Sequence, residues 1–119
     1  MNAMASANGL LENKILNALW QIEEESSNKD NITAADVLEK LNASFEKRAY
    51  TTIKTVMDRL AVKKILLRRK CGRKFCYTSV CSRKELAQEA VQEVVSRYFN
   101  GDVRGLMRML EEQCLTSRK

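Results

Sequence analysis

The period of the hydrophobic pattern changes twice along the chain, and these changes constrain the fold more than any other sequence feature. Apolar residues recur at helical spacing over residues 10–24, again after Thr33, and over residues 50–63. Two short strand-like runs around a Gly-containing turn follow over residues 65–78 and predict a β-hairpin. Helical spacing then returns and continues to about residue 113. The sequence therefore predicts a mainly α fold with one small β-hairpin between its third and fourth helices.

Local signals set the expected ends of several helices. Thr33 is a favourable N-cap, and Asp36 three residues later resembles the second half of a capping box. The run SRKE at residues 82–85 is a clearer capping box and predicts the start of a long helix. Asn-Gly-Asp at residues 100–102 should end that helix and cap the next one. The three glutamates at residues 23–25 are expected to form a solvated helix end.

The positive charge of the chain is concentrated in one segment. The whole chain carries 21 basic and 15 acidic residues, a net charge of +6, but residues 46–84 alone carry 13 basic and two acidic residues. Residues 1–45 and 85–119 are both net negative. A local basic segment in a folded protein is typical of a polyanion partner, usually nucleic acid. The alternative is an ordinary solvated surface with extra lysines.

The third predicted helix has two chemically different faces. At 100° per residue, one face is apolar and consists of Ile53, Val56, Met57 and Leu60. The opposite face consists of Thr51, Thr52, Lys54, Thr55, Asp58 and Arg59, with Lys54 and Asp58 spaced to form an ion pair. Threonines are poor helix formers, so three of them on an exposed face indicate a role in binding rather than helix propensity. The alternative is an ordinary amphipathic helix.

Three helices followed by a basic hairpin are the winged-helix arrangement. In it, the third helix enters the DNA major groove and the hairpin contacts the sugar-phosphate backbone of the DNA beside it. Residues 8–80 are therefore expected to form a winged helix-turn-helix DNA-binding domain on double-stranded DNA. The predicted base contacts, chosen for hydroxyl and amine donors, are Thr51, Thr52, Lys54 and Thr55. The predicted phosphate contacts are Lys47, Arg48, Tyr50, Arg59, Lys70, Arg73 and Lys74.

The last two predicted helices have apolar residues that the winged-helix domain does not account for. Their apolar residues are too many to leave in water and lie too far along the chain to complete a small winged-helix core. Residues 82–115 are therefore expected to form a helical dimerisation region, which would place two recognition helices on one two-fold site. Its predicted dimer contacts are Leu86, Val91, Val94, Val95, Tyr98, Phe99, Leu106, Met109 and Leu110. The alternative is that these helices fold back onto their own domain.

The composition also limits the chemistry that the chain can perform. Histidine is absent, which removes the Ser-His-Asp triad, the Cys-His dyad and mixed Cys/His zinc sites. The cysteines are Cys71, Cys76, Cys81 and Cys114, and the C-x4-C-x4-C spacing of the first three does not fit a zinc ribbon. We expect no enzyme, no cofactor and no metal site. A thiol- or metal-switched regulator, with Cys71, Cys76 or Cys81 as the sensor, and a winged-helix protein-interaction module remain alternative functions.

No apolar run approaches the roughly 18 residues of a membrane span, and no secretory signal is visible at the N-terminus. The sequence therefore predicts a cytoplasmic protein without membrane insertion, in which the cysteines are expected to stay reduced.

Four segments also resemble one known family. The opening ENKILNALW at residues 12–20 is similar to the E-x-x-V-L-x-x-L-W motif of the penicillinase-repressor family. This family comprises β-lactamase and methicillin-resistance repressors and a copper-responsive branch. TIKTVMDRL at residues 52–60 resembles its recognition-helix signature T-x-x-T-x-x-x-R-L, and GRKFCY at residues 72–77 resembles its wing. FNGDVRGL at residues 99–106 resembles its C-terminal F-x-G-x-x-x-x-L segment.

This resemblance implies a homodimeric winged-helix transcriptional repressor that binds a pseudo-palindromic operator. It also implies a regulatory protease or sensor as a further partner, because relatives are released from DNA by cleavage in their C-terminal helices. Three positions depart from the family pattern. Lys64 replaces the usual Gly after the third helix, Glu93-Val94 replaces the cleaved Asn-Phe bond, and Cys114 stands alone where the copper branch has C-x-C pairs.

Overall fold

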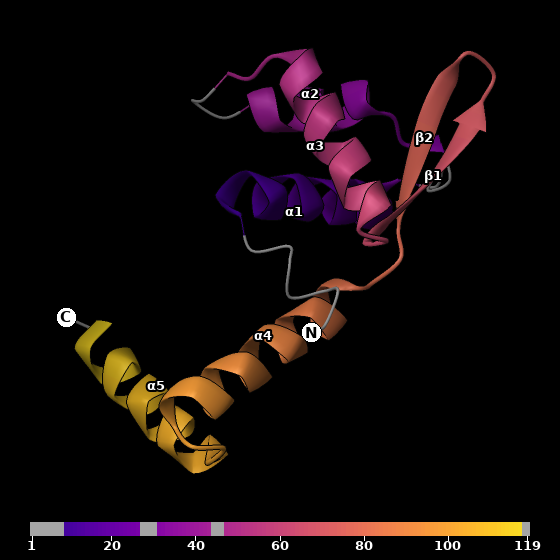
Figure 1. The fold of residues 1–119 in the computed structure, drawn as a ribbon. Helices are drawn as coiled ribbons and strands as arrows, with labels where there is room; N and C mark the ends of the chain where they lie inside the picture. Colours follow the sequence, from indigo (N-terminus) through magenta and orange to yellow (C-terminus); the bar gives the residue numbers. More distant parts are fainter. Residues whose placement is uncertain (1–8, 27–30, 44–46, 118–119) are drawn as a thin grey trace. The chain divides into compact units, whose positions relative to one another are not determined.

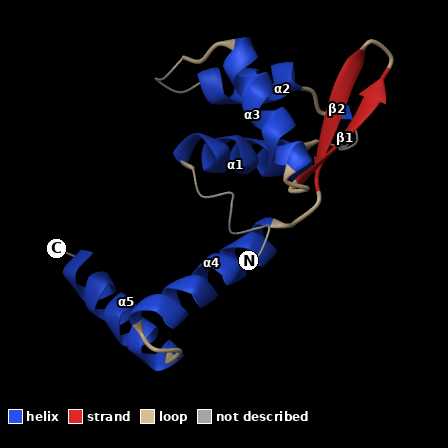
Figure 2. Cartoon of the chain, in the orientation of Figure 1, coloured by secondary structure: helices blue, strands red, loops and turns tan. Residues whose placement is uncertain are grey.

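The computed structural model describes residues 9–26, 31–43 and 47–117, and it has the predicted element order (Figure 1). The elements are α1 (Leu10–Glu25), α2 (Ala34–Asn42), α3 (Tyr50–Val62), β1 (Leu66–Cys71), β2 (Lys74–Ser79), α4 (Arg83–Tyr98) and α5 (Val103–Ser117). The fold is a winged helix followed by two helices (Figure 2), as the sequence predicted. The chain divides between Arg83 and Lys84 into two compact units, here called the winged unit and the helical unit.

Three helices and the hairpin enclose the core of the winged unit. The most completely buried apolar side chains are those of Ile15, Leu16, Leu19, Ile32, Val37, Ile53, Met57, Leu60, Ile65, Leu66 and Tyr77. They come from α1, α2 and α3, from both strands, and from the segments just before α2 and β1. Burying this much apolar surface is what holds α1, α2 and α3 together against the hairpin. The predicted apolar face of the third helix is confirmed, because all four of its residues are buried.

The hairpin is antiparallel, with Leu66 opposite Ser79 at its base and Cys71 opposite Lys74 at its tip. Gly72 turns the chain at the tip with a φ of +68°, a conformation that glycine adopts at no steric cost. The amide of Tyr77 donates to the carbonyl of Ile32 at 2.8 Å, so the segment before α2 pairs with β2. This pairing fixes the base of the wing to the helical core.

The ends of α2 and α3 follow their local sequence signals. Thr33 and Asp36 form the predicted capping box, with the Thr33 amide 2.9 Å from the Asp36 carboxylate and the Asp36 amide 3.2 Å from the Thr33 hydroxyl. At the end of α3, the amide of Ile65 donates to the carbonyl of Leu60 at 3.0 Å. Lys64 takes the left-handed conformation there, with a φ of +66°. A glycine at this position, as in the family that the sequence resembles, would adopt this conformation at no steric cost.

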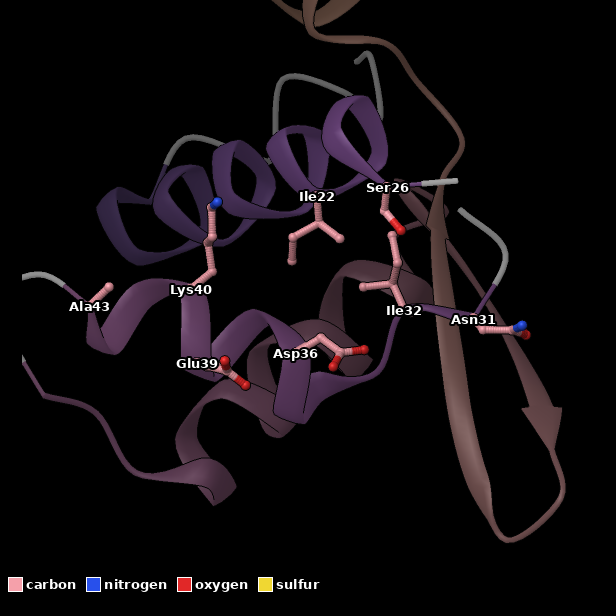
Figure 3. Close-up of a pocket in the computed structure, with 8 residues that line it drawn as sticks. All are labelled: Ile22, Ser26, Asn31, Ile32, Asp36, Glu39, Lys40 and Ala43. Atoms are coloured by element: carbon pink, nitrogen blue, oxygen red, sulfur yellow. The ribbon is translucent and has the colours of Figure 1, made fainter. Parts of the chain in front are cut away.

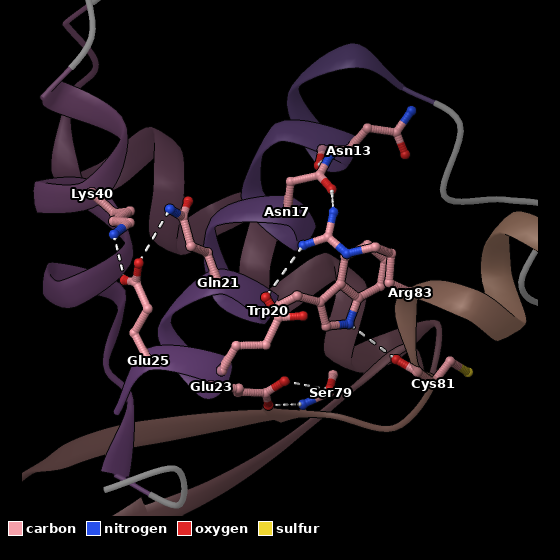
Figure 4. A network of polar contacts seen from close by, with 11 residues as sticks. Asn13, Asn17, Trp20, Gln21, Glu23, Glu25, Lys40, Ser79, Cys81 and Arg83 are labelled. Atoms are coloured by element: carbon pink, nitrogen blue, oxygen red, sulfur yellow. Dashed lines mark hydrogen bonds and ion pairs between the residues drawn. The ribbon is translucent and has the colours of Figure 1, made fainter. Parts of the chain in front are cut away.

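At the acidic end of α1, Glu24 and Glu25 are exposed as predicted, but the prediction was wrong for the half-buried Glu23 (Figure 4). Both carboxylate oxygens of Glu23 accept hydrogen bonds from Ser79, at 3.0 Å from its amide and 2.8 Å from its hydroxyl. Glu25 forms an ion pair with Lys40 of α2 at 2.8 Å. The indole of Trp20 also donates to the carbonyl of Cys81 at 3.1 Å. These contacts attach α1 to α2 and to the chain that follows β2.

The helical unit consists of α4, a tight corner and α5. Asn100 and Gly101 both have positive φ at this corner, and the Asp102 carboxylate accepts a hydrogen bond from the Arg104 amide at 3.1 Å. The predicted end of the first of these helices and the predicted N-cap of the second are therefore present. A Cβ on Gly105 would lie 2.8 Å from the Phe99 ring, so the first turn of α5 lies directly against that ring. The last helix continues to Ser117, beyond its predicted end near residue 113.

Candidate nucleic-acid interface and the apolar helical face

The outer face of α3 carries exposed hydroxyls. Thr51, Thr52 and Thr55 are all exposed, and their side chains make no hydrogen bond to other residues that the structure describes. Arg59, on the same face, is also exposed without a described ion pair. Each threonine offers one hydroxyl donor, two acceptor lone pairs and a methyl group to a ligand. The face can therefore make both hydrogen bonds and apolar contacts with the edges of bases.

Asp58 connects this face to the hairpin. Its carboxylate accepts from the amine of Lys54 at 2.8 Å, from the guanidinium of Arg68 at 3.0 Å and from the phenol of Tyr77 at 2.6 Å. The Lys54–Asp58 pair was predicted from its spacing, but the contributions of Arg68 and Tyr77 were not. Burial raises the pKa of Asp58, but the hydrogen bonds from these three groups outweigh it and lower the pKa below its ordinary value.

The same cluster contains an aromatic ring that holds both cations. The Arg68 guanidinium lies 4.3 Å from the centroid of the Phe75 ring, and the Lys54 amine lies 5.4 Å from it. Both distances fall within the range of cation–π attraction. Burial, together with the hydrogen bond to Asp58, raises the pKa of Tyr77 far above its ordinary value, so its hydroxyl stays a donor at every physiological pH. Sequence reasoning missed Arg68, Phe75 and Tyr77 because a hairpin pattern does not show which strand residues face a helix.

The predicted phosphate contacts other than Arg59 fall into two groups. Lys70, Arg73 and Lys74 lie exposed at the tip of the wing, as the sequence suggested. Just before α3, the amine of Lys47 donates to the carbonyl of Asn42, and Tyr50, the first residue of α3, is exposed. Arg48 is half-buried, and its amide donates to the Asn42 side chain at 2.9 Å. Asn42 at the end of α2 is thus bonded to both Lys47 and Arg48, which lie just before α3.

The cysteines of the wing lie partly inside the fold. Cys76 of β2 lies opposite Arg69 of β1 in the hairpin register. Arg69 and Cys71 are two residues apart on β1 and so lie on the same face of the hairpin, which places the thiols of Cys71 and Cys76 on one face. Cys76 is buried, and a hydrogen bond with the Cys71 thiol, together with burial, raises the pKa of Cys76. A raised pKa leaves less of the reactive thiolate, so this environment does not favour Cys76 as a redox sensor. Among the described residues, no group of three or more Cys, Asp or Glu side chains could hold a metal ion.

The helical unit exposes many of the residues predicted to form a dimer. Tyr98 is 75% exposed, and Val91, Val94, Met109 and Leu110 are also exposed. Val95 and Leu106 are instead buried, and Leu86 and Phe99 are half-buried. Sequence reasoning missed three further exposed apolar residues of α5, which are Val103, Met107 and Leu115. The Glu93–Val94 bond lies within α4, so a protease would have to unwind that helix to cleave it.

A surface pocket between α1 and α2 has a volume of about 510 Å³ (Figure 3). Ile22, Ile32 and Ala43 supply its apolar lining, and Asp36, Glu39 and Lys40 supply charges. Two of these charged side chains already hold the fold together, since Asp36 caps α2 and Lys40 pairs with Glu25. Glu39 alone does not make a converging set of polar groups for a ligand.

Comparison with known proteins assigns the chain to a family. Within the described part of the chain, no helix combines the length and the apolar character needed to cross a bilayer. No curated protein was found to match the chain. The family model described as Penicillinase repressor matches residues 8–119, which cover both the winged unit and the helical unit. The exposed threonines of α3, the basic wing and the apolar helical pair all fall inside this match, and the chain belongs to the penicillinase repressor family.

Proposed function

We propose that the protein is a transcriptional repressor that binds double-stranded DNA in a sequence-specific manner as a homodimer on a pseudo-palindromic operator. The observation that carries this proposal is the outer face of α3. Three exposed threonines and a cation lie on one helix beside a wing that carries basic residues at its tip. Helix propensity and core packing give no reason for threonines at these positions. Contact with bases does give a reason, because the threonine hydroxyls can hydrogen-bond to base edges in the major groove and the methyl groups can contact the methyl group of thymine.

In this proposal, the basic residues other than Lys54 bind DNA phosphates rather than read bases. Those of the wing tip and of the segment before α3 would contact phosphates on either side of the major groove. Such contacts supply affinity and register but read no sequence directly. The base-reading residues would be Thr51, Thr52, Lys54 and Thr55, and the phosphate-binding residues Lys47, Arg48, Tyr50, Arg59, Lys70, Arg73 and Lys74.

The helical unit would join two copies of the chain. Its exposed apolar side chains form a surface that a second copy could cover, and a two-fold arrangement repeats the same patch on both partners. Two winged units would then lie at half-sites separated by about one or more turns of DNA. The dimer contacts proposed from the sequence are extended here by the exposed side chains of Val103, Met107 and Leu115.

The decisive experiment is in vitro selection from random DNA duplexes with the purified full chain. Recovery of a two-fold motif would establish both sequence-specific binding and dimeric recognition, and its half-site spacing would report the dimer geometry. If selection returned no motif and no duplex bound at low salt, the repressor proposal would fail. The winged helix would then be better explained as a protein-interaction module.

Two variants then separate base reading from phosphate binding. Thr55→Ala should reduce the preference for the selected motif over random duplex by about tenfold, while affinity for random duplex changes little. Arg73→Ala should weaken binding to both duplexes about equally and should reduce the salt dependence of binding. Identical behaviour of the two variants would show that α3 does not read bases.

A further inference from the structure

We propose that Asp58 is a positioning residue for DNA recognition, which holds Lys54 of α3 and Arg68 of the wing in one fixed arrangement. In this role it contributes to discrimination between sequences more than to affinity. The proposal rests on the DNA-binding function proposed above. It adds an acidic residue, on the face that would meet a polyanion, to the set of residues that determine specificity.

The contacts of Asp58 join two elements that are distant in sequence. One carboxylate oxygen lies 2.8 Å from the Lys54 amine, one turn back along α3. The other oxygen receives Arg68 of β1 at 3.0 Å and Tyr77 of β2 at 2.6 Å. Tyr77 is almost completely buried, so its hydroxyl is a fixed point of the core to which the carboxylate is attached. Asp58 therefore stands on a rigid support and connects the helix to both strands of the wing.

A carboxylate is required here because two cations share one ring. Lys54 and Arg68 both lie over Phe75, at 5.4 and 4.3 Å from its centroid. Without a negative charge between them, like-charge repulsion would separate the two side chains and their attraction to the ring would weaken. An asparagine at position 58 could keep the hydrogen bond from Tyr77 but would lose both ion pairs. The charge of Asp58, rather than its shape, keeps this cluster together.

Fixing Lys54 matters because a lysine side chain is otherwise flexible. Its four-carbon stem has several rotatable bonds, and binding must remove their conformational freedom. Asp58 removes much of that freedom before DNA arrives, which is the general benefit of preorganisation. The Lys54 amine has three donors, and one bond to Asp58 leaves two for the acceptor atoms of guanine. Lys54 can therefore reach a base without leaving Asp58, and only from one direction.

The test compares Asp58→Asn with Glu39→Gln in the full-length protein. Glu39 is an exposed carboxylate on α2, so its substitution makes the same change in net charge outside the cluster. For each protein, the dissociation constants for the selected duplex and for random duplex are measured, and their ratio gives the discrimination. We expect Asp58→Asn to reduce this ratio about tenfold, the size of one lost base contact. Glu39→Gln should leave the ratio within twofold of the wild type.

Affinity for random duplex should move in the opposite direction. Removing a negative charge from the DNA-facing surface should raise it, by up to about threefold in Asp58→Asn. A rise in affinity with a fall in discrimination is a combination that simple damage to the fold would not produce. If discrimination in Asp58→Asn stayed within twofold of the wild type, or if Glu39→Gln lowered it equally, the positioning role would be rejected.

A double substitution tests whether Asp58 acts through Lys54. If it does, Asp58→Asn should change discrimination by less than threefold in a Lys54→Ala background, since the group that it positions is gone. Independent, multiplicative effects of the two substitutions would contradict the proposal. Tyr77→Phe, which removes only the phenol hydroxyl, is the second route if Asp58→Asn does not fold, and it should lower discrimination about threefold. An unchanged ratio in a folded Tyr77→Phe protein would then overturn the proposal.

The wild-type measurement separates this proposal from the one on which it rests. A wild-type protein that shows no discrimination would overturn the proposed function, and the role of Asp58 in it as well. A wild-type protein that discriminates, with Asp58→Asn equal to it, would overturn the positioning role alone.

Discussion

The winged unit buries most of its apolar side chains, whereas the helical unit exposes most of its own. Of the 18 buried apolar residues among those that the structure describes, 16 lie in the winged unit and only Val95 and Leu106 in the helical unit. The exposed large apolar side chains show the reverse bias, with five in the winged unit and eight in the helical unit. The winged unit thus encloses a core of its own, whereas the helical unit presents most of its apolar residues to the outside.

This difference indicates how each unit is stabilised. Layers of helix and hairpin bury their apolar faces against one another in the winged unit, which is sufficient for a small domain. Isolated helices of this length are marginal in water, and most helical stability in proteins comes from packing of an apolar face. The helical unit has such a face but leaves it largely open, and this is the physical basis for proposing a second copy as its cover.

The largest expected effect is on the core of the winged unit. Leu19 is completely buried, so Leu19→Ala should lower the free energy of unfolding by about 3 kcal/mol through lost apolar burial and a cavity. Urea unfolding followed by circular dichroism measures this as a lower midpoint with an unchanged slope. Leu10→Ala is the matched control, because this leucine of the same helix is 72% exposed and should cost less than about 0.5 kcal/mol. Equal losses in the two variants would contradict the assignment of the core.

The next largest effect is expected on association through the helical unit. Leu110→Glu places a charge in the exposed apolar face of α5 and should weaken the dimer by about 2 kcal/mol, or roughly 30-fold. Sedimentation equilibrium measures this change, and the unfolding midpoint of the winged unit should stay unchanged. Gln92→Glu, a charge change at an exposed polar position of α4, should leave the dimer intact. A wild-type protein that is monomeric at tens of micromolar would break the comparison between the units.

A smaller effect on stability is expected at two helix ends, one in each unit. Lys64 after α3 and Asn100 after α4 both have positive φ, at 66° and 50°. Lys64→Gly should stabilise the protein by about 0.5–1 kcal/mol, because relief of steric strain exceeds the added entropy of the unfolded chain. Asn100→Gly should gain less, since asparagine tolerates this conformation better than lysine does. Thermal unfolding distinguishes the two variants, and a Lys64→Ala variant without any gain shows that conformation, not charge, is responsible.

The smallest expected effect is the pH dependence that Asp58 gives to the winged unit. Its pKa is lowered in the folded protein, so the cluster stabilises the fold fully above the ordinary value of 3.8. The contribution is lost as the pH falls through the lower folded pKa, and for a partly exposed carboxylate it should stay below about 1 kcal/mol. Unfolding measured between pH 2 and 6 should show a shallower acid decline for Asp58→Asn than for the wild type. The same shallow decline in Glu39→Gln would assign the effect to net charge instead.

Most of the fold could be predicted from the sequence because its signals are local. The helical period, the capping box at Thr33 and Asp36, and the Gly72 turn each act within a few residues of chain. They placed the elements to within about one residue at most ends, the exception being the end of α5. Residues 27–30 of the predicted loop between the first two helices lie outside the described part of the chain.

The contacts between elements could not be predicted in the same way. The glutamates at the end of α1 look solvated in sequence, yet Glu23 is bonded to Ser79, 56 residues away. The spacing of Lys54 and Asp58 predicted their pair, but nothing in the sequence showed that Tyr77 would donate to the same carboxylate. Such pairs depend on which strand residues turn toward which helix, and that is set by packing rather than by any local pattern.

The sequence by itself determined the order of the elements, the faces of α3, the location of the basic segment and the family to which the chain belongs. Those properties follow from residue spacing and chemistry along one dimension. Only the tertiary structure decided that Asp58 would gather a lysine, an arginine and a tyrosine from three elements. It also decided that Val95 and Leu106 would be buried while Tyr98 and Leu110 would remain exposed. The first outcome requires segments distant in sequence to be brought together, and apolar burial drives that step without specifying which polar groups meet.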